Sequence, residues 1–269
     1  MKYKIGDVAR MLGISTDLLR YYEKKGVVSP QKGERNDYRY YETWDINFLM
    51  DCLWFKQFNF SIEEIAHMVS GSGFDELRDT LEAKEEEIER NLRRQQLLLD
   101  RLRRHRREME RGKRLLGKCD IVTSVDTIFF MNRHNFAYVD DPALAGLNQA
   151  WLQYMPFVRR CFEICLEDLP GGEGEGDFSW GLSIDPRYAK EFPVLCQPPV
   201  KQLPPRKCVH TVFKCSGKGA FSPVHLRYLI DFAEENGLKV CDHAYGNLLC
   251  SVTEEEGQTG YFEVWIPVE

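Results

Sequence analysis

One uninterrupted segment, from Glu76 to about Leu116, constrains the fold of this 269-residue chain more than any other feature. It is rich in Glu, Arg and Leu, contains no proline, and has Gly112 as its only glycine. Because proline and glycine are the residues that most often end helices, the segment predicts one helix, far longer than helices of ordinary globular domains. Such a helix predicts separate domains before and after it.

A heptad seam runs along this predicted helix. Eight positions follow alternating steps of three and four residues, and five of them are apolar: Leu92, Gln95, Leu99, Leu102, Arg106, Met109, Lys113 and Leu116. This spacing is typical of a coiled coil and predicts a homodimer formed through residues 76–118. Leu77, Leu81 and Ile88 precede the seam slightly out of register, which indicates a stutter. We expect the basic run at 101–107 to be a solvated face.

The distribution of charge differs between the two parts of the chain. The net charge is −6 and the isoelectric point is near 5.7, which taken alone argues against a nucleic-acid partner. Residues 1–118 nevertheless carry 24 Lys and Arg against 21 Asp and Glu, whereas residues 119–269 carry 12 against 21. The acidity therefore belongs to the C-terminal part, and the N-terminal part remains compatible with DNA.

The first 26 residues have the pattern of a helix-turn-helix. An amphipathic segment at 4–12 ends at Gly13, Ser15 or Thr16 caps a second helix, and Gly26 closes it. The exposed side of the second helix presents polar, basic and aromatic groups that suit base edges and phosphates: Thr16, Asp17, Arg20, Tyr21 and Lys24. Tyr22 lies on the apolar side, where packing explains it.

The next 45 residues predict a hairpin and two further helices. Arginines and tyrosines flank a polar turn at 32–37, an arrangement that suits phosphate contact. Thr43 is expected to cap a third helix running to about Gln57. Its inward residues are expected to be Ile46, Leu49, Met50, Leu53 and Trp54. Ser61 begins a capping box for a fourth helix.

Six linked motifs in this region resemble those of the MerR family of transcription regulators. They are Ile5-Gly6-Asp7-Val8-Ala9, Gly13-Ile14-Ser15, Leu19-Arg20-Tyr21-Tyr22-Glu23, Gly26 with Pro30, Tyr38-Arg39-Tyr40-Tyr41 and Phe60-Ser61-Ile62-Glu63-Glu64-Ile65. Two positions depart from the family pattern, because Asn59 and Asp37 stand where the family usually has glycine. Asn tolerates a left-handed backbone, so we expect the turn at Asn59 to survive. Asp37 makes the geometry of the wing tip harder to predict.

The resemblance implies a winged helix-turn-helix over residues 1–75, a dimer helix over 76–118 paired antiparallel with its partner, and promoter DNA as the ligand. The implied DNA-binding residues are Ser15, Thr16, Asp17, Arg20, Tyr21, Lys24, Tyr38, Arg39, Tyr40 and Lys56. Taken without the resemblance, Lys56 is an ordinary solvated lysine.

Residues 119–269 predict a domain with an internal repeat. The first pass has strands at 121–130, a helix at 143–166 interrupted by Pro156, a Gly/Glu loop at 170–177 and a strand at 178–184. After a Pro-rich linker at 198–205, the second pass has a strand at 209–215, a turn at 217–219, a helix from Ser222-Pro223 and a hairpin over 245–268. The order resembles the duplicated βαββ unit of GyrI-like effector-binding domains. The expected fold is therefore α+β and multidomain.

The last strand predicts a ligand site. Phe262, Val264 and Ile266 share the face that packs on helices, while Tyr261, Glu263 and Trp265 share the other. An acid between two aromatic rings suits a lipophilic cation. Glu263 could equally be a solvated residue of an edge strand, and the resemblance to GyrI-like domains favours the ligand. Trp180, Tyr245 and Tyr138 are the expected aromatic walls, although core packing also explains Trp180 and Tyr138.

The favoured function is a cytoplasmic transcription regulator that distorts promoter DNA for RNA polymerase when a small lipophilic ligand binds. No cofactor, metal site, catalytic residue or membrane segment is expected, and the nine cysteines are expected to be reduced. Two alternatives remain. A metal or redox sensor would use Cys119, or the pair Cys161 and Cys165, whose spacing of four residues is helical. A GyrI-like drug hydrolase would use Glu263 as general base, and a GyrI-like protein that only sequesters a drug is the related alternative.

Overall fold

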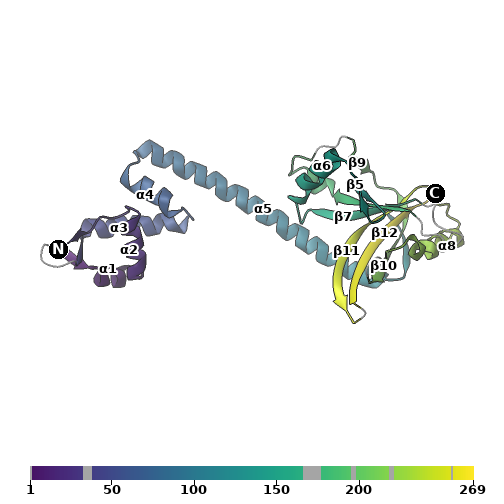
Figure 1. The fold of residues 1–269 in the computed structure, drawn as a ribbon, viewed down its shortest axis with the longest axis horizontal. Coiled ribbons are helices and arrows are strands. Elements are labelled where there is room, and N and C mark those ends of the chain that lie inside the picture. Colours follow the sequence, from purple (N-terminus) through teal and green to yellow (C-terminus); the bar gives the residue numbers. More distant parts are fainter. Residues whose placement is uncertain (1, 33–37, 166–176, 195–197, 218–220, 256) are drawn as a thin grey trace. The chain divides into compact units, whose positions relative to one another are not determined.

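The computed structural model describes residues 2–32, 38–165, 177–194, 198–217, 221–255 and 257–269. They form two units, Met1–Arg93 and Arg94–Glu269, and the division falls within the long helix α5, Phe74–Leu115 (Figure 1). Three predicted features lie wholly or mostly outside the described residues: the wing tip at Asp37, the loop at 170–177 and the turn at 217–219. Among the described residues, no helix combines the length and apolar character needed to cross a membrane.

The N-terminal unit consists of short helices (Figure 1) and a three-stranded antiparallel sheet of order β1-β3-β2. The helices are α1 Ile5–Leu12, α2 Thr16–Lys24, α3 Thr43–Gln57 and α4 Ile62–Ser70. The strands are β1 Lys2–Lys4, β2 Gln31–Lys32 and β3 Arg39–Glu42. The predicted hairpin is therefore present as β2 and β3, and β1 is an addition that the sequence pattern did not indicate.

The helix ends of this unit follow the local sequence. Ser15 Oγ accepts a hydrogen bond from the Leu18 amide at 3.1 Å and caps α2. Ser61 and Glu64 form the predicted capping box of α4. Asn59 has a φ of 63°, which confirms that asparagine serves in the left-handed turn before α4. At α3 the prediction was wrong by one residue, because Glu42 is the cap and Thr43 is the first helical residue.

The inward face of α3 also differs from the prediction. Leu49, Cys52 and Phe55 are the buried residues, whereas Met50 and Trp54 are each 54% exposed. The reason is that apolar residues surround this helix on all sides, so their periodicity does not select one face. Tyr22 is 1% exposed and belongs to the core, as its place on the apolar side of α2 predicted.

Helix α5 is the single long helix that the sequence predicts. Leu77 and Leu81 pack against the core of the N-terminal unit, and Leu97 and Leu98 pack against a core of the C-terminal unit. All eight seam residues are exposed in the single chain, where no partner covers them. Gly112 lies where the helix approaches the sheet, since a Cβ added there would meet a methyl carbon of Leu249 at 2.6 Å.

The basic run at 101–107 is only partly the solvated face that we expected. The Arg101 side chain is 7% exposed, and its guanidinium donates to the Pro156 carbonyl at 3.2 Å and to Glu108 at 3.3 Å. Arg104 Nε lies 3.3 Å from the Tyr188 hydroxyl. Besides the seam, a second face of α5 therefore packs on other elements of the C-terminal unit. The sequence analysis did not predict this face because charged residues form it.

The C-terminal unit is built on one nine-stranded sheet. The strand order is β4-β10-β12-β11-β7-β8-β5-β6, with β9 paired to β5. The strands are β4 Cys119–Thr123, β5 Thr127–His134, β6 Ala137–Tyr138, β7 Val158–Ile164, β8 Phe178–Ile184, β9 Lys201–Leu203, β10 Lys207–Ser216, β11 Ala244–Glu254 and β12 Gly257–Pro267. The helices are α6 Pro142–Leu152, α7 Pro186–Ala189 and α8 Arg227–Glu235, the last preceded by a 3₁₀ turn, η2 Pro223–Leu226.

The predicted helix at 143–166 is wrong in its second half. Helix α6 ends at Leu152, and Val158 and Phe162 lie on strand β7 instead of a helical face. Pro156 separates the two elements, because a proline removes a helical hydrogen bond and clashes with the preceding turn. The predicted linker at 198–205 also contains the short strand β9.

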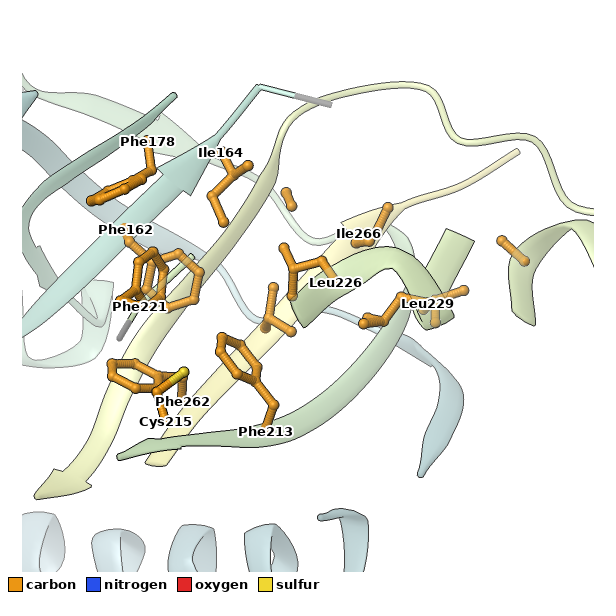
Figure 2. Packing of buried hydrophobic residues seen from close by; sticks show 14 of the residues in the cluster. Phe162, Ile164, Phe178, Phe213, Cys215, Phe221, Leu226, Leu229, Phe262 and Ile266 are labelled. Atoms are coloured by element: carbon orange, nitrogen blue, oxygen red, sulfur yellow. The ribbon is translucent and has the colours of Figure 1, made fainter. Parts of the chain in front are cut away.

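The two faces of the central strands are occupied differently. Phe262, Val264 and Ile266 of β12 form a core with Leu229 of α8 and with aromatic residues of β7, β8 and β10. Figure 2 shows Phe262 and Ile266 within this core. This confirms the predicted packing face of the last strand. Glu263 points to the opposite face, since side chains alternate along a strand, and there it meets Arg111 of α5.

Candidate nucleic-acid interface and effector site

Helix α2 presents the predicted polar side chains. Asp17, Arg20 and Lys24 are exposed, Tyr21 is 40% exposed, and Thr16 is half-buried. Arg20 donates to Asp17 at 2.9 Å, with both side chains largely open to solvent. An exposed pair of this kind is worth little, so the guanidinium can exchange Asp17 for a phosphate or a base edge at small cost.

The strands of the wing are tied to α2 by one ion pair. Arg39 of β3 donates to Glu23 of α2, and both side chains are about half-buried. Tyr38 is 60% exposed, and Tyr40 is half-buried opposite Gln31 in the β2–β3 ladder. Arg39 thus positions the wing against the second helix of the motif, a role that its predicted contact with DNA did not include.

Lys56 lies at the end of α3 and is exposed. Its ammonium group donates to the Phe60 carbonyl at 3.0 Å, which fixes the side chain beside the turn that precedes α4. Ser15, the cap of α2, is also exposed. The ten predicted DNA-binding residues therefore all belong to the N-terminal unit, and none has a fully buried side chain.

The effector site predicted around Glu263 contains a buried charge cluster. Glu263 is 2% exposed, and its Oε1 lies 3.0 Å from His210 Nε2 and 2.5 Å from an Arg111 guanidinium nitrogen. Burial raises the pKa of the Glu263 carboxyl, but the His210 hydrogen bond and the Arg111 charge outweigh burial and hold that pKa below its usual value. Glu263 is therefore an ionised carboxylate compensated within the chain.

A second ion pair also joins α5 to the sheet, but here the carboxylate is on the helix and the guanidinium is on the sheet. Glu108 of α5 accepts from Arg159 of β7 at 3.1 Å and from Arg101 at 3.3 Å. Helix α5 thus supplies a carboxylate to the sheet at Glu108 and a guanidinium at Arg111. The sequence analysis did not predict these ion-pair partners or His210. The one sequence signal for them is Gly112, which allows the helix to approach the sheet closely.

The aromatic residues beside Glu263 are packed, and this face is not the open one that we expected. Trp265 is 3% exposed and stacks on His210, with ring centroids 5.0 Å apart. Tyr245 stacks on Trp265 at 5.8 Å. Tyr261 borders a cavity of about 530 Å³, which lies between β11, β12 and the end of α5. Val122 and Leu203 pack against Trp265 and Tyr245, while Arg111 of α5 covers Glu263.

Trp180 and Tyr138 do not join the Glu263 cluster. Trp180 pairs with Phe162 across β7 and β8, on the face that carries Phe262, and so lies on the opposite side of the sheet from Glu263. Tyr138 is 67% exposed on the short strand β6. Both rings instead flank Arg133, whose guanidinium carbon lies 4.9 Å from the Tyr138 centroid and 5.8 Å from that of Trp180.

The cysteine spacing considered for a metal site depended on a helix that is absent. Cys161 lies in β7, where a residue four positions later is about 13 Å away along the extended backbone, about twice the distance of one helical turn. Burial raises the pKa of the Cys161 thiol to about 12, which keeps the free thiol protonated at neutral pH. Within the described ranges, no three His, Cys, Asp or Glu side chains group as metal ligands do.

A helix, a glycine turn and a capped second helix, followed by a two-stranded wing, define a winged helix-turn-helix DNA-binding unit. The family profile described as MerR HTH family regulatory protein matches residues 3–72. The HTH-type transcriptional regulator CueR of Escherichia coli O157:H7 is 35% identical over 94 residues, which is 33% of this chain and 69% of that protein. The chain belongs to the MerR family of DNA-binding transcription regulators.

Other similar proteins match this chain over a shorter segment or with lower structural similarity. The HTH-type transcriptional activator mta of Bacillus subtilis (strain 168) is 32% identical over 75 residues, or 28% of this chain and 29% of that protein. Among solved structures, the complex described as EcmrR-DNA in EcmrR-RPo covers 99% of both chains at 16% identity and a TM-score of 0.40. At that TM-score the likeness supports no statement about this chain.

Proposed function

We propose that this MerR-family protein is a dimeric, ligand-controlled transcription activator that distorts promoter DNA so that RNA polymerase can engage. The observation that carries the proposal is the exposed side of α2 beside a wing held by Arg39. Arg20 has only an exposed partner there, and Tyr21 and Lys24 are open to solvent. Groups of this kind, on a second helix of this fold, enter the major groove of DNA. We place the protein in the cytoplasm and assign it no enzymatic activity.

The dimer is proposed to form through residues 76–118. The support is that the apolar seam residues Leu92, Leu99, Leu102 and Met109 of α5, and Leu116 directly after it, are exposed in the isolated chain. A row of exposed apolar side chains along a helix is costly in water and is covered when two helices pair. Two DNA-binding units would then meet two half-sites of a pseudo-palindromic operator.

The functional parts are proposed as a DNA-binding domain at 1–75, the dimer helix at 76–118 and a GyrI-like effector domain at 119–269. The order strand, helix, strand, strand occurs as β5-α6-β7-β8 and again as β10-α8-β11-β12. In the sheet these strands lie in mirrored places, β10-β12-β11 and then β7-β8-β5. Such an order suits a duplicated βαββ unit with a pseudo-twofold axis.

The ligand is proposed to be a small lipophilic cation that competes with Arg111 for Glu263. Glu263 is an ionised, buried carboxylate, and one of its two partners belongs to α5, the helix that continues into the N-terminal unit. The cavity beside Tyr261 is lined by Glu110 and Gly112, the neighbours of Arg111 in sequence. A cation that entered from this cavity and displaced Arg111 from Glu263 would loosen α5 from the sheet, which would couple the ligand to the DNA-binding part.

A footprinting titration with two variants tests the DNA-binding proposal. Wild type should protect a pseudo-palindrome between promoter elements. Arg20→Ala should weaken specific binding by about 1–3 kcal/mol, because a base-contacting arginine is lost. Lys56→Ala should weaken binding to all sequences and flatten its salt dependence, as expected for a phosphate contact.

Arg78→Ala is the matched control, because Arg78 is an exposed arginine at the start of α5 whose partners are Asp75 and Asp79. It should leave the footprint unchanged. Absence of any sequence-specific protection, or an equal loss in Arg78→Ala and Arg20→Ala, would contradict the proposal.

A further inference from the structure

A second cavity lies on the face of the sheet opposite Glu263. It has a volume of about 230 Å³, and side chains of both halves of the domain line it. Arg133, Arg160 and Trp180 come from β5, β7 and β8, while Phe221 and Phe262 come from the half that contains α8. The volume is near the small end of ligand sites, which suits a ligand of one or two rings.

The charge in this cavity is not balanced by the described part of the chain. No described carboxylate lies within ion-pair distance of Arg133 or Arg160, although most other arginines of the C-terminal unit have such a partner. Partial burial, and then the nearby charge of Arg133, lower the pKa of the Arg160 guanidinium. Two guanidinium groups thus lie close together with like charge, an arrangement that an anion would stabilise.

One donor of this pair also lacks a hydrogen bond. Arg133 Nε is buried and has no hydrogen-bond acceptor among the described residues. Buried donors are almost always paired in native proteins, so an unpaired one indicates a group that the described part of the chain does not supply. The rings of Tyr138 and Trp180 hold the guanidinium carbon of Arg133 at 4.9 and 5.8 Å, which fixes its plane without supplying an acceptor.

The remaining walls are aromatic. Trp180 lies against Phe221 with ring centroids 4.8 Å apart and against Phe262 at 6.0 Å, so the floor of the cavity is apolar. A planar ring can stack on this floor while a charged group on its edge reaches the two arginines. Arginine is suited to this task because its planar fork donates two parallel hydrogen bonds to a carboxylate.

We propose that this cavity, the arginine cavity, binds a small aromatic carboxylate, with the carboxylate held by Arg133 and Arg160 and the ring stacked on Trp180. The site goes beyond the proposed function, because it takes a ligand of the opposite charge on the opposite face of the sheet from Glu263. The two sites have no lining residue in common, so either can fail without the other.

Isothermal titration calorimetry of the full-length protein with 2-naphthoate tests the proposal, with neutral 2-naphthamide and inorganic phosphate as comparison ligands. We expect 2-naphthoate to bind, and the amide and phosphate to bind at least about tenfold more weakly, because each lacks either the charge or the ring. Arg133→Gln and Arg160→Gln should each weaken binding about tenfold, and Arg160→Lys, which keeps the charge but loses the fork, should fall between.

Arg187→Gln is the matched control, because Arg187 is an exposed arginine of the same unit that pairs with Asp185. It should bind 2-naphthoate as wild type does. Circular dichroism melts of each variant separate lost binding from lost folding, and Arg160 is exposed, so its substitution should leave the fold intact. The proposal is overturned if 2-naphthoate does not bind, if the amide or phosphate binds equally well, or if folded Arg160→Gln binds like wild type. The footprinting titration of the same variants reports on DNA binding separately.

Discussion

The two faces of the C-terminal sheet both place charge beside aromatic rings, and they differ in how that charge is balanced. On one face, Glu263 is enclosed by His210 and by Arg111. On the other, Arg133 and Arg160 meet no carboxylate among the described residues. A charge that the chain compensates stabilises the fold, and a ligand must displace one of its partners. A charge that the chain leaves unbalanced is available for a ligand directly.

The cover over each face explains this difference. Helix α5 lies over the Glu263 face and supplies Arg111 from the same element that joins the two units. Over the other face, the half-buried Trp180 leaves the two arginines at the edge of a cavity. The Glu263 face is therefore suited to a ligand that changes the position of α5. The face with Arg133 and Arg160 is suited to a ligand that does not contact α5.

The largest expected effect compares the tryptophans of the two faces. Trp265→Ala should lower the free energy of unfolding by about 3–5 kcal/mol, because it removes a buried ring stacked between His210 and Tyr245. Trp180→Ala should cost less, about 1–2 kcal/mol, because that ring is half-buried. Urea unfolding followed by circular dichroism measures both. Equal losses would show that the rings of the two faces are equally structural.

The next effect compares a paired with an unpaired arginine. Arg111→Gln should destabilise the protein by about 1–3 kcal/mol, because the buried Glu263 carboxylate loses a charged donor. Arg160→Gln should change stability by less than about 0.5 kcal/mol or raise it slightly, because it relieves repulsion from Arg133. The same urea titrations give both values. A large loss in Arg160→Gln would mean that this arginine already has a partner in the protein.

A smaller effect is expected from pH. Because the folded protein holds the pKa of Glu263 below its usual value of 4.5, ionised Glu263 contributes stability above that pH, and the contribution is lost as pH falls through the lowered pKa. The melting temperature of wild type should therefore fall more steeply than that of Glu263→Gln between about pH 5 and about pH 3. Arg160→Gln should keep the wild-type steepness. Parallel curves for wild type and Glu263→Gln would argue against an ionised, paired Glu263.

The N-terminal unit was largely predictable because its signals are local. Ser15, Gly13 and the capping box at Ser61 fix helix ends through hydrogen bonds and backbone geometry within a few residues. The failures there occur where local signals are weak. Apolar residues surround α3, so Met50 and Trp54 could not be placed from their spacing.

The C-terminal unit was less predictable because its site depends on contacts between distant residues. The pattern of β12 gave the correct two faces, but the partners of Glu263 are 53 and 152 positions away in sequence. Charged residues that pack show no hydrophobic periodicity. The run of α5 that contains Arg101 was therefore predicted to be solvated, and the contact of Arg111 was not predicted. The helical periodicity assigned to 143–166 was accidental, and Pro156 was the signal against it.

The competition between a cation and Arg111 for Glu263 is tested most directly by the affinity of the full-length protein for crystal violet, a lipophilic cation. The account predicts that Arg111→Gln binds this dye about tenfold more tightly than wild type, since the internal competitor is gone, a gain of about 1.4 kcal/mol. Glu263→Gln should bind it more weakly, while the neutral leuco form of the dye should not distinguish the variants. Equal affinity of wild type and Arg111→Gln for crystal violet would contradict the account.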